Sequence, residues 1–185
     1  MSDAVPPGQY TTRELPVLHI GDIPRFESRS WTFTIDGLVE TEKSWRWPEI
    51  RGREATTFTA DFHCVTTWTS LQQTWEGAPV SELLEEAGPL PEAKFVMVHA
   101  DGGYTTNLPL ADLLHEDVIL AWNRNGEALE PKHGYPLRLI VPHLYGWKSA
   151  KWVRRLELLA EDRLGYWEER GYHRRGDPWN EERFG

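Results

Sequence analysis

Apolar and polar residues alternate one by one in several short stretches of this 185-residue chain. In the clearest of them, Trp31, Phe33 and Ile35 fall on one side of the chain and polar residues fall on the other. This period of two is typical of a β-strand with one buried face. Further strands are predicted at residues 55–62, 94–99, 118–122, 136–141 and 151–159. The Asn125-Gly126 pair predicts a hairpin turn between the strands at 118–122 and 136–141.

Helical segments are fewer and shorter than the strands. Ser81 to Ala87 is predicted to be a helix with Leu83 and Leu84 facing inward, and Gly88 is its stop signal. Residues 110–115 are expected to form one or two helical turns. The predicted fold class is therefore α+β, mixed and β-rich.

The length of the chain favours a single domain. Residues 1–13 are predicted to be an extended N-terminal tail, because two prolines and a glycine occupy positions 6–8. Residues 14–185 are predicted to form the domain. We expect the aromatic and charged stretch at 165–185 to wrap its surface rather than build its core.

Charge and cysteine content exclude several classes of protein. The net charge of −9 argues against general nucleic-acid binding, which needs clustered lysine and arginine. A single cysteine excludes a disulfide within the chain. No stretch approaches the roughly 18 apolar residues of a membrane helix, and the first residues do not resemble a signal peptide. We therefore predict a cytoplasmic protein that binds neither nucleic acid nor membrane.

The only cysteine, Cys64, follows the strand predicted at 55–62. A lone cysteine is commonly a small buried apolar residue. Its place at a strand end, beside His63 and among threonines, weakens this interpretation. A thiolate is a soft ligand, and a strand end is rigid enough to direct it at a metal. A Cys–His nucleophile of a hydrolase is the alternative. Adjacent residues on a strand point to opposite faces, however, so His63 is badly placed as a base for Cys64.

Two basic segments beside glycines lie close together in the sequence. The first runs from His133 to Arg138, and the second includes Gly146, Ser149 and Lys151. An arginine fork, a lysine and backbone N–H groups near a glycine suit the recognition of a phosphate. The alternative is that these are ordinary surface charges on strands.

Taken in order, several segments resemble the molybdenum-binding domain of the sulfite oxidase family, in particular its small bacterial members. Together they extend over almost the whole chain from about residue 15, and their order and spacing make the resemblance specific. The matching segments are Val17 to Pro24, Trp31 to Val39, Asp61 to Trp68, Gly102 to Tyr104, His133 to Arg138, and Lys148 to Trp152.

The resemblance implies a β-rich domain built around one molybdopterin, a pterin dithiolene that carries molybdenum. It implies that Cys64 is the catalytic cysteine and ligates the molybdenum. It also implies a set of cofactor-binding residues, in which Ser149, Ala150 and Lys151 form a loop that closes over the pterin. The full set is His19, Asp101, His133, Arg138, Ser149, Ala150 and Lys151.

Two departures from the family pattern bear on the substrate. Sulfite oxidases carry an arginine shortly after the ligand cysteine, whereas residues 65–69 contain none. They also carry a tyrosine before the Asn-Gly turn, and Trp122 is expected to occupy that place. Trp68 and Trp122 are predicted walls of a pocket for a neutral or weakly charged substrate. Candidates for a missing substrate-binding charge are Arg25, Arg46 and Arg124.

The sequence therefore predicts an oxidoreductase that performs two-electron oxygen-atom transfer, on a small S-oxide or N-oxide rather than on sulfite. Because no haem or immunoglobulin-like domain is recognised, we expect a monomer that exchanges electrons with a separate partner. The rival hypothesis is a non-catalytic module of the same fold that binds the pterin or a partner protein. A metal-free Cys–His hydrolase is the third.

Overall fold

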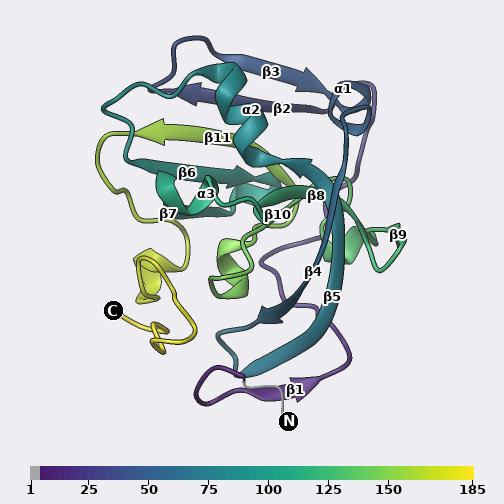
Figure 1. Cartoon of the computed structure of the whole chain (residues 1–185), viewed down its shortest axis with the longest axis vertical. Helices are drawn as coiled ribbons and strands as arrows, with labels where there is room; N and C mark the ends of the chain where they lie inside the picture. The colour runs from purple at the N-terminus through teal and green to yellow at the C-terminus, as the bar shows by residue number, and fades with distance from the viewer. Residues whose placement is uncertain (1–4) are drawn as a thin grey trace.

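The computed structural model describes residues 5–185, which form two β-sheets with short helices around them (Figure 1). The first sheet has six strands: β1 Tyr10–Thr12, β4 Thr56–His63, β5 Trp68–Pro79, β8 Ile119–Arg124, β9 Glu127–Ala128 and β10 Arg138–Ile140. The second has five: β2 Thr32–Gly37, β3 Lys43–Arg46, β6 Phe95–Ala100, β7 Thr105–Pro109 and β11 Val153–Leu159. The α-helices are α1 Trp47–Arg51, α2 Val80–Ala87 and α3 Leu110–Leu113, and the 3₁₀ turns are η1 Asp101–Gly103, η2 Pro131–His133, η3 Gly146–Lys148 and η4 Glu168–Arg170.

The second sheet has the order β3-β2-β11-β6-β7, with β2 and β11 parallel and the other neighbours antiparallel. Its apolar side chains join those of α2 and of β8 and β10 in the main core. α2 buries Leu83 and Leu84 and ends at Gly88, whose φ of +69° suits glycine. The α+β, β-rich fold class is thus confirmed, as is the predicted helix.

The β4–β5 hairpin extends from this core toward β1 at the far end of the molecule (Figure 1). Its tip holds Cys64 against a smaller apolar cluster that includes Phe62, Trp68 and Trp75. The prediction that a strand over residues 55–62 delivers Cys64 at its end is confirmed, since β4 ends at His63.

The long strand β5 was not expected from the sequence. Thr69 and Ser70 are fully buried although they are polar, and Gln72 has a φ of +55°, which interrupts the period of two. Its pairing with β4 and with β8 also contains irregular registers. The alternation of apolar and polar residues is therefore not visible along β5.

Two predictions, one about a turn and one about the N-terminal tail, differ from the structure. The Asn125-Gly126 turn joins β8 to the two-residue strand β9, not to β10, which pairs with β8 further along the chain. Part of the predicted N-terminal tail is also a paired strand, because Tyr10–Thr12 lies parallel to β5 as β1. The backbone groups at the edge of β5 are the hydrogen-bond partners of β1, and the sequence pattern does not reveal this pairing.

No helix among the described residues is both long and apolar enough to cross a membrane.

Candidate functional site

Cys64 is the first residue of the tight turn that closes the β4–β5 hairpin. The backbone N–H of Cys64 donates to Trp68 O (2.9 Å), and that of Thr67 donates to Cys64 O (3.0 Å). The Gln9 amide also donates to Cys64 O, at 3.1 Å. Bonds on both sides of the residue therefore fix the direction of the thiol.

Cys64 is 8% exposed, and its thiol has a polar neighbour, since Thr66 Oγ1 lies 3.1 Å from Cys64 Sγ. Burial raises the pKa of the Cys64 thiol, while hydrogen bonds from Thr66 and the charge of Arg138 act in the opposite direction. His63 points away, because its Nδ1 lies 3.0 Å from Thr69 Oγ1 and it does not line the cavity described next. This geometry disfavours the Cys–His hydrolase.

A cavity of about 380 Å³ opens beside Cys64. It lies at the carboxyl end of β4, between the hairpin tip, the η3 turn and the C-terminal segment. Residues 15–20, 101–104 and 133–138 also contribute to its lining, so distant parts of the sequence form its walls. All eight candidate site residues line it: His19, Cys64, Asp101, His133, Arg138, Ser149, Ala150 and Lys151. The structure thus brings together every residue of the predicted site.

Arg138 is the central charge of this cavity and is 6% exposed. Its Nε and Nη1 donate to the backbone oxygens of Ser149 and His133, each at 3.2 Å, and Nη2 has no partner among the described residues. No carboxylate pairs with it in that part of the chain. Burial lowers the pKa of Arg138 to about 9, and the charge of Arg124 acts in the same direction. A buried cation without a counter-ion indicates that an anion belongs here.

Further basic groups surround the same space. Lys151 Nζ lies 3.0 Å from His19 Nδ1 and donates to Lys132 O, and burial together with Arg138 lowers the pKa of Lys151 to about 7. Burial lowers the pKa of His133 to about 4, helped by the charges of Arg124 and Arg138. These positive groups repel one another, and an anion bound among them offsets this repulsion. The cavity therefore favours an anionic ligand.

The pKa of Lys151 makes anion binding depend on pH. Below about pH 7 the Lys151 ammonium is charged, and above it the amine is neutral, so affinity falls as pH rises through this value. For cofactor-free protein and sulfate, whose charge is constant over this range, we expect about a tenfold loss, the equivalent of roughly 1.4 kcal/mol. Isothermal titration calorimetry from pH 6 to pH 8.5 measures it. Lys151→Met should bind sulfate weakly without a step near pH 7, and a step that persists in this variant would contradict the assignment.

Ser149 and Ala150 hold the loop of the cavity against β10. The Ser149 hydroxyl accepts from the Val141 N–H (2.9 Å), and Ala150 O accepts from the Leu139 N–H (2.9 Å). At Gly146 a Cβ atom would lie 2.5 Å from the Phe62 ring, so only glycine lets this loop approach the strand that carries Cys64. Asp101, on the opposite wall, pairs with Arg154 (3.3 Å).

The structure corrects two predictions about the substrate side. Trp68 lines the cavity, but Trp122 does not, since it is 1% exposed within the main core and lies under the Arg51 guanidinium. Two tyrosines line the cavity instead, Tyr104, whose hydroxyl donates to Trp147 O, and Tyr172, so the argument from a missing tyrosine fails. The three arginines considered as sources of substrate charge, Arg25, Arg46 and Arg124, also lie outside the cavity lining.

Tyr172 and its neighbour Trp167 were missed as site residues. They belong to the stretch 165–185, which was expected only to wrap the surface, and they stack at 5.0 Å against each other beside Trp147. Burial raises the pKa of Tyr172, and the charge of Cys64 acts in the same direction. No sequence pattern links these residues to Cys64, because the contact arises only when the C-terminal segment folds back.

This arrangement defines a class of protein. A buried thiol, which is a soft metal ligand when ionised, opens into the same cavity as an unpaired arginine, a lysine and two histidines. Such a donor set fits a metal that is held jointly by the protein and by an anionic organic cofactor. The residues present therefore fit a molybdenum ion on a phosphate-bearing pterin dithiolene.

Comparison with known proteins identifies the family. Residues 20–167 match the oxidoreductase molybdopterin binding domain, and the chain belongs to this family. The oxidoreductase YuiH of Bacillus subtilis (strain 168) is 45% identical over 184 residues, which cover 99% of this chain and 93% of that protein. The protein-methionine-sulfoxide reductase catalytic subunit MsrP of Campylobacter jejuni is 29% identical and is matched over 77% of this chain and 54% of its own length.

A solved structure agrees with these relatives. The sulfane dehydrogenase SoxCD from Paracoccus pantotrophus superposes with a TM-score of 0.73 and 29% identity, over 78% of this chain and 42% of that one. The resemblance to the sulfite oxidase family is thereby confirmed. The protein is an oxidoreductase whose cofactor is molybdenum bound to molybdopterin.

Proposed function

We propose that this enzyme reduces neutral S-oxides or N-oxides by oxygen-atom transfer and that sulfite is not its preferred substrate. The observation that carries the proposal is the wall of the cavity near Cys64. Among the described residues that line the cavity, Arg138 is the only cation whose charge acts on the Cys64 thiol. The other side chains of this wall are uncharged: Val65, Thr66, Trp68, Trp167 and Tyr172. Arg183, behind the wall, donates to the backbone oxygens of Val65 (2.7 Å) and Pro7 (3.1 Å).

The residues of the cavity divide into two roles. Cys64 would ligate the metal, and Arg138 and Lys151 would hold the phosphate of the pterin, with His19, Asp101, His133 and the Ser149–Ala150 loop around the pterin. When bound, the cofactor supplies the two-electron exchange of an oxygen atom. The balanced reaction takes an S-oxide, two electrons and two protons to a sulfide and water.

Tyr172 is the residue that we propose to contact the substrate oxygen. Its raised pKa keeps the phenol protonated at neutral pH, so it can donate a hydrogen bond to an oxide oxygen. Trp68 and Trp167 offer apolar surface to the substituents on sulfur. The name of MsrP, a methionine-sulfoxide reductase, supports this substrate class.

Electrons would come from a separate protein, and the description of MsrP as a catalytic subunit supports this. A monomer in the cytoplasm stays a prediction from the sequence. Light scattering and cell fractionation test it.

A charge introduced at Val65 tests the substrate preference. For the holoenzyme we expect kcat/KM for dimethyl sulfoxide or a neutral methionine-sulfoxide amide to exceed that for sulfite by about 30-fold or more, because an anion without a charged partner loses roughly 2 kcal/mol or more. Val65→Arg should raise the sulfite-to-sulfoxide ratio, whereas Val65→Gln, of similar length without the charge, should not. Assays use a reduced dye as donor for the oxides and ferricyanide as acceptor for sulfite.

Two outcomes would contradict the proposal. Wild-type protein that oxidises sulfite faster than it reduces any oxide would overturn the substrate class. A loaded protein that turns over none of these substrates would favour the non-catalytic binding module.

A further inference from the structure

The C-terminal segment, residues 165–185, supplies Trp167 and Tyr172 to the cavity although it has almost no regular structure. It contains only the short turn η4 and one isolated bridge between Tyr172 and Phe184. Figure 1 shows it beside the body of the molecule, as the yellow end of the chain. Two backbone hydrogen bonds, Tyr166 N–H to Thr105 O (2.9 Å) and Tyr145 N–H to Gly176 O (2.8 Å), attach the segment to the body of the molecule, and side-chain contacts do the rest.

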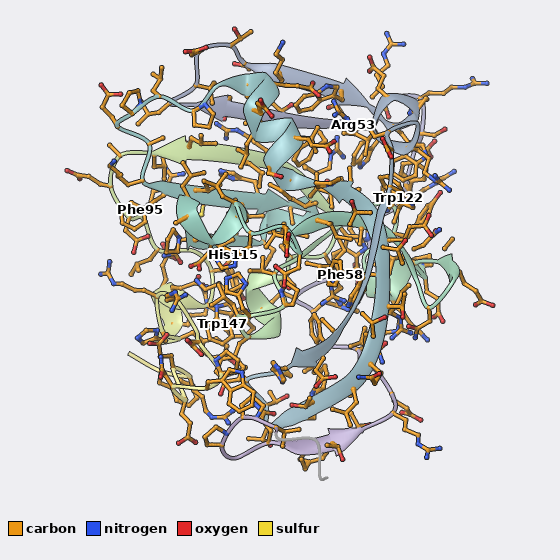
Figure 2. All side chains as sticks on the ribbon, in the orientation of Figure 1. Arg53, Phe58, Phe95, His115, Trp122 and Trp147 are labelled. Atoms are coloured by element: carbon orange, nitrogen blue, oxygen red, sulfur yellow. The ribbon has the colours of Figure 1, made fainter. Side chains whose placement is uncertain are left out.

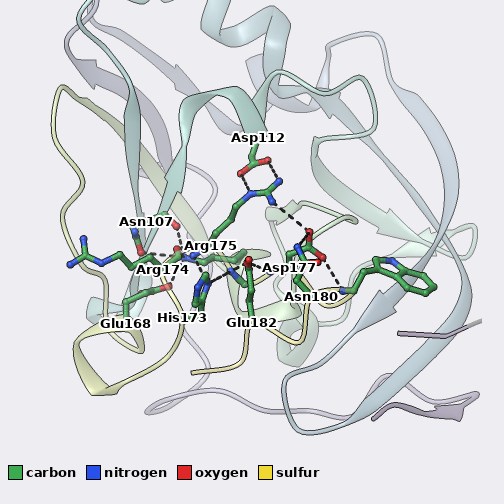
Figure 3. Close-up of polar contacts among 12 residues, drawn as sticks. Asn107, Asp112, Glu168, His173, Arg174, Arg175, Asp177, Asn180 and Glu182 are labelled. Atoms are coloured by element: carbon green, nitrogen blue, oxygen red, sulfur yellow. Dashed lines mark hydrogen bonds and ion pairs between the residues drawn. The ribbon is translucent and has the colours of Figure 1, made fainter. Parts of the chain in front are cut away.

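The strongest of these contacts centre on a buried ion pair. Lys148 Nζ and Glu168 Oε1 are 2.7 Å apart, and both side chains are 0% exposed. Glu168 Oε1 also accepts from Thr106 Oγ1 and Trp147 Nε1, each at 2.8 Å. Lys148 Nζ donates in addition to Asn107 O (2.6 Å) and Arg174 O (2.5 Å) (Figure 3). One ion pair thus joins β7, η3 and the C-terminal segment.

Each residue of the ion pair is close in sequence to one group of residues that line the cavity: Lys148 to the proposed cofactor loop, and Glu168 to the proposed substrate-contacting aromatic residues. Lys148 directly precedes the loop Ser149–Lys151, which lies on the cofactor side. Glu168 follows Trp167 and lies four residues before Tyr172, on the substrate side. At Gly165 a Cβ atom would lie 2.5 Å from Thr106 Cα, so glycine lets the segment approach β7 closely enough for Glu168 to be buried.

A second contact fixes the same segment further along the chain. Arg175 donates to both carboxylate oxygens of Asp112, at 3.1 and 3.2 Å (Figure 3). Asp112 also lies 3.0 Å from His143 Nε2. Asp112, His115 and His143 are close enough together to suggest a metal site. The His115 and His143 rings are stacked at 4.3 Å, so their in-plane lone pairs do not converge, and the carboxylate is already paired with Arg175. Neither Asp112 nor Arg175 lines the cavity, so this contact serves as a control.

We propose that Lys148 and Glu168 are positioning residues that set the distance between Tyr172 and the cofactor loop. A buried ion pair adds little net stability, because the desolvation of its charges offsets their attraction. Its hydrogen bonds, by contrast, permit only one arrangement of the three elements. The pair therefore controls the geometry of the cavity more than the stability of the fold.

The test separates geometry from stability with an apolar replacement of the pair. The double variant Lys148→Met/Glu168→Leu keeps the buried volume without the charges, and Glu168→Gln is the second variant should the double one fail to fold. Arg175→Gln is the control. Each holoenzyme is compared for thermal midpoint, molybdenum content, cleavage by trypsin after Arg170 and Arg174, and kcat and KM for whichever substrate the wild type uses.

We expect the double variant to unfold near the wild-type temperature and to keep its molybdenum, while kcat falls about tenfold, roughly 1.4 kcal/mol, with a smaller change in KM. Cleavage of its C-terminal segment should be about tenfold faster, and Arg175→Gln should keep wild-type kcat. Wild-type kcat and wild-type protection in the double variant would overturn the proposal. The cleavage result needs no substrate, so it distinguishes a failure of this proposal from a failure of the proposed function.

Discussion

Replacing Cys64 by serine is expected to abolish turnover while leaving the fold intact. A serine hydroxyl is a hard and neutral donor at pH 7, whereas the cysteine supplies a soft thiolate to the metal. The fall should reach about three orders of magnitude or more, which corresponds to roughly 4 kcal/mol in the barrier. The measurement is kcat/KM with the preferred substrate, at equal molybdopterin content.

Two controls make this result specific. The serine differs by one atom at a position that is 8% exposed, so the free energy of unfolding should change by only about 1–2 kcal/mol. His63→Gln, at the adjacent position, should keep most of the activity, because His63 faces Thr69 and not the cavity. A hydrolase that pairs Cys64 with His63 needs both residues, so His63→Gln would then lose as much activity as Cys64→Ser. Equal losses in the two variants, or full activity in Cys64→Ser, would contradict our assignment.

Replacing Arg138 by methionine is expected to empty the cavity of its cofactor without destabilising the protein. Arg138 is buried, has no carboxylate partner among the described residues, and has a pKa lowered by burial to about 9. Its charge therefore destabilises the cofactor-free protein, and it is stabilising only when an anion is bound. Loss of such a contact costs about 2–5 kcal/mol, or roughly 30-fold to several thousand-fold in cofactor affinity.

The sign of the stability change distinguishes this account from a structural role for Arg138. We expect cofactor-free Arg138→Met to be as stable to urea as the wild type, or more stable, and to contain little molybdopterin after expression. Arg138→Lys keeps the charge but loses the planar fork, so its cofactor content should be intermediate. A large loss of stability in cofactor-free Arg138→Met, with normal cofactor content, would show that the arginine serves the fold.

The sequence was informative where function depends on local pattern. The alternation at residues 31–36, the strand before Cys64 and the helix that ends at Gly88 all follow from periodicity and turn chemistry. Cys64, Arg138 and Lys151 are candidates because a thiol at a strand end suits a metal and basic groups beside glycines suit a phosphate, and the family resemblance favours this interpretation over a buried cysteine and surface charges. The structure places them on one cavity, although their individual roles remain predictions.

The sequence was uninformative where long-range contacts decide the outcome. Strand β5 buries Thr69 and Ser70, which break the apolar pattern, and β1 exists because β5 offers it an edge. The prediction of Trp122 as a cavity wall is wrong, because large aromatic residues occur in cores and pockets alike. In the same way Tyr172 lines the cavity because the C-terminal segment folds back, and no local sequence pattern indicates the buried Lys148–Glu168 contact that joins this segment to η3. Figure 2 shows Trp122 beside the strands of the first sheet, apart from Trp147 near the C-terminal segment.

The metal content of the purified protein tests the central claim most directly. The full chain is expressed in a host that makes molybdopterin, and molybdenum and pterin are measured against protein concentration. Our account predicts about one molybdenum and one pterin per folded chain, with the Cys64 thiol protected from alkylation until the cofactor is removed. Folded and active protein without molybdenum, with Cys64 freely alkylated, would contradict it.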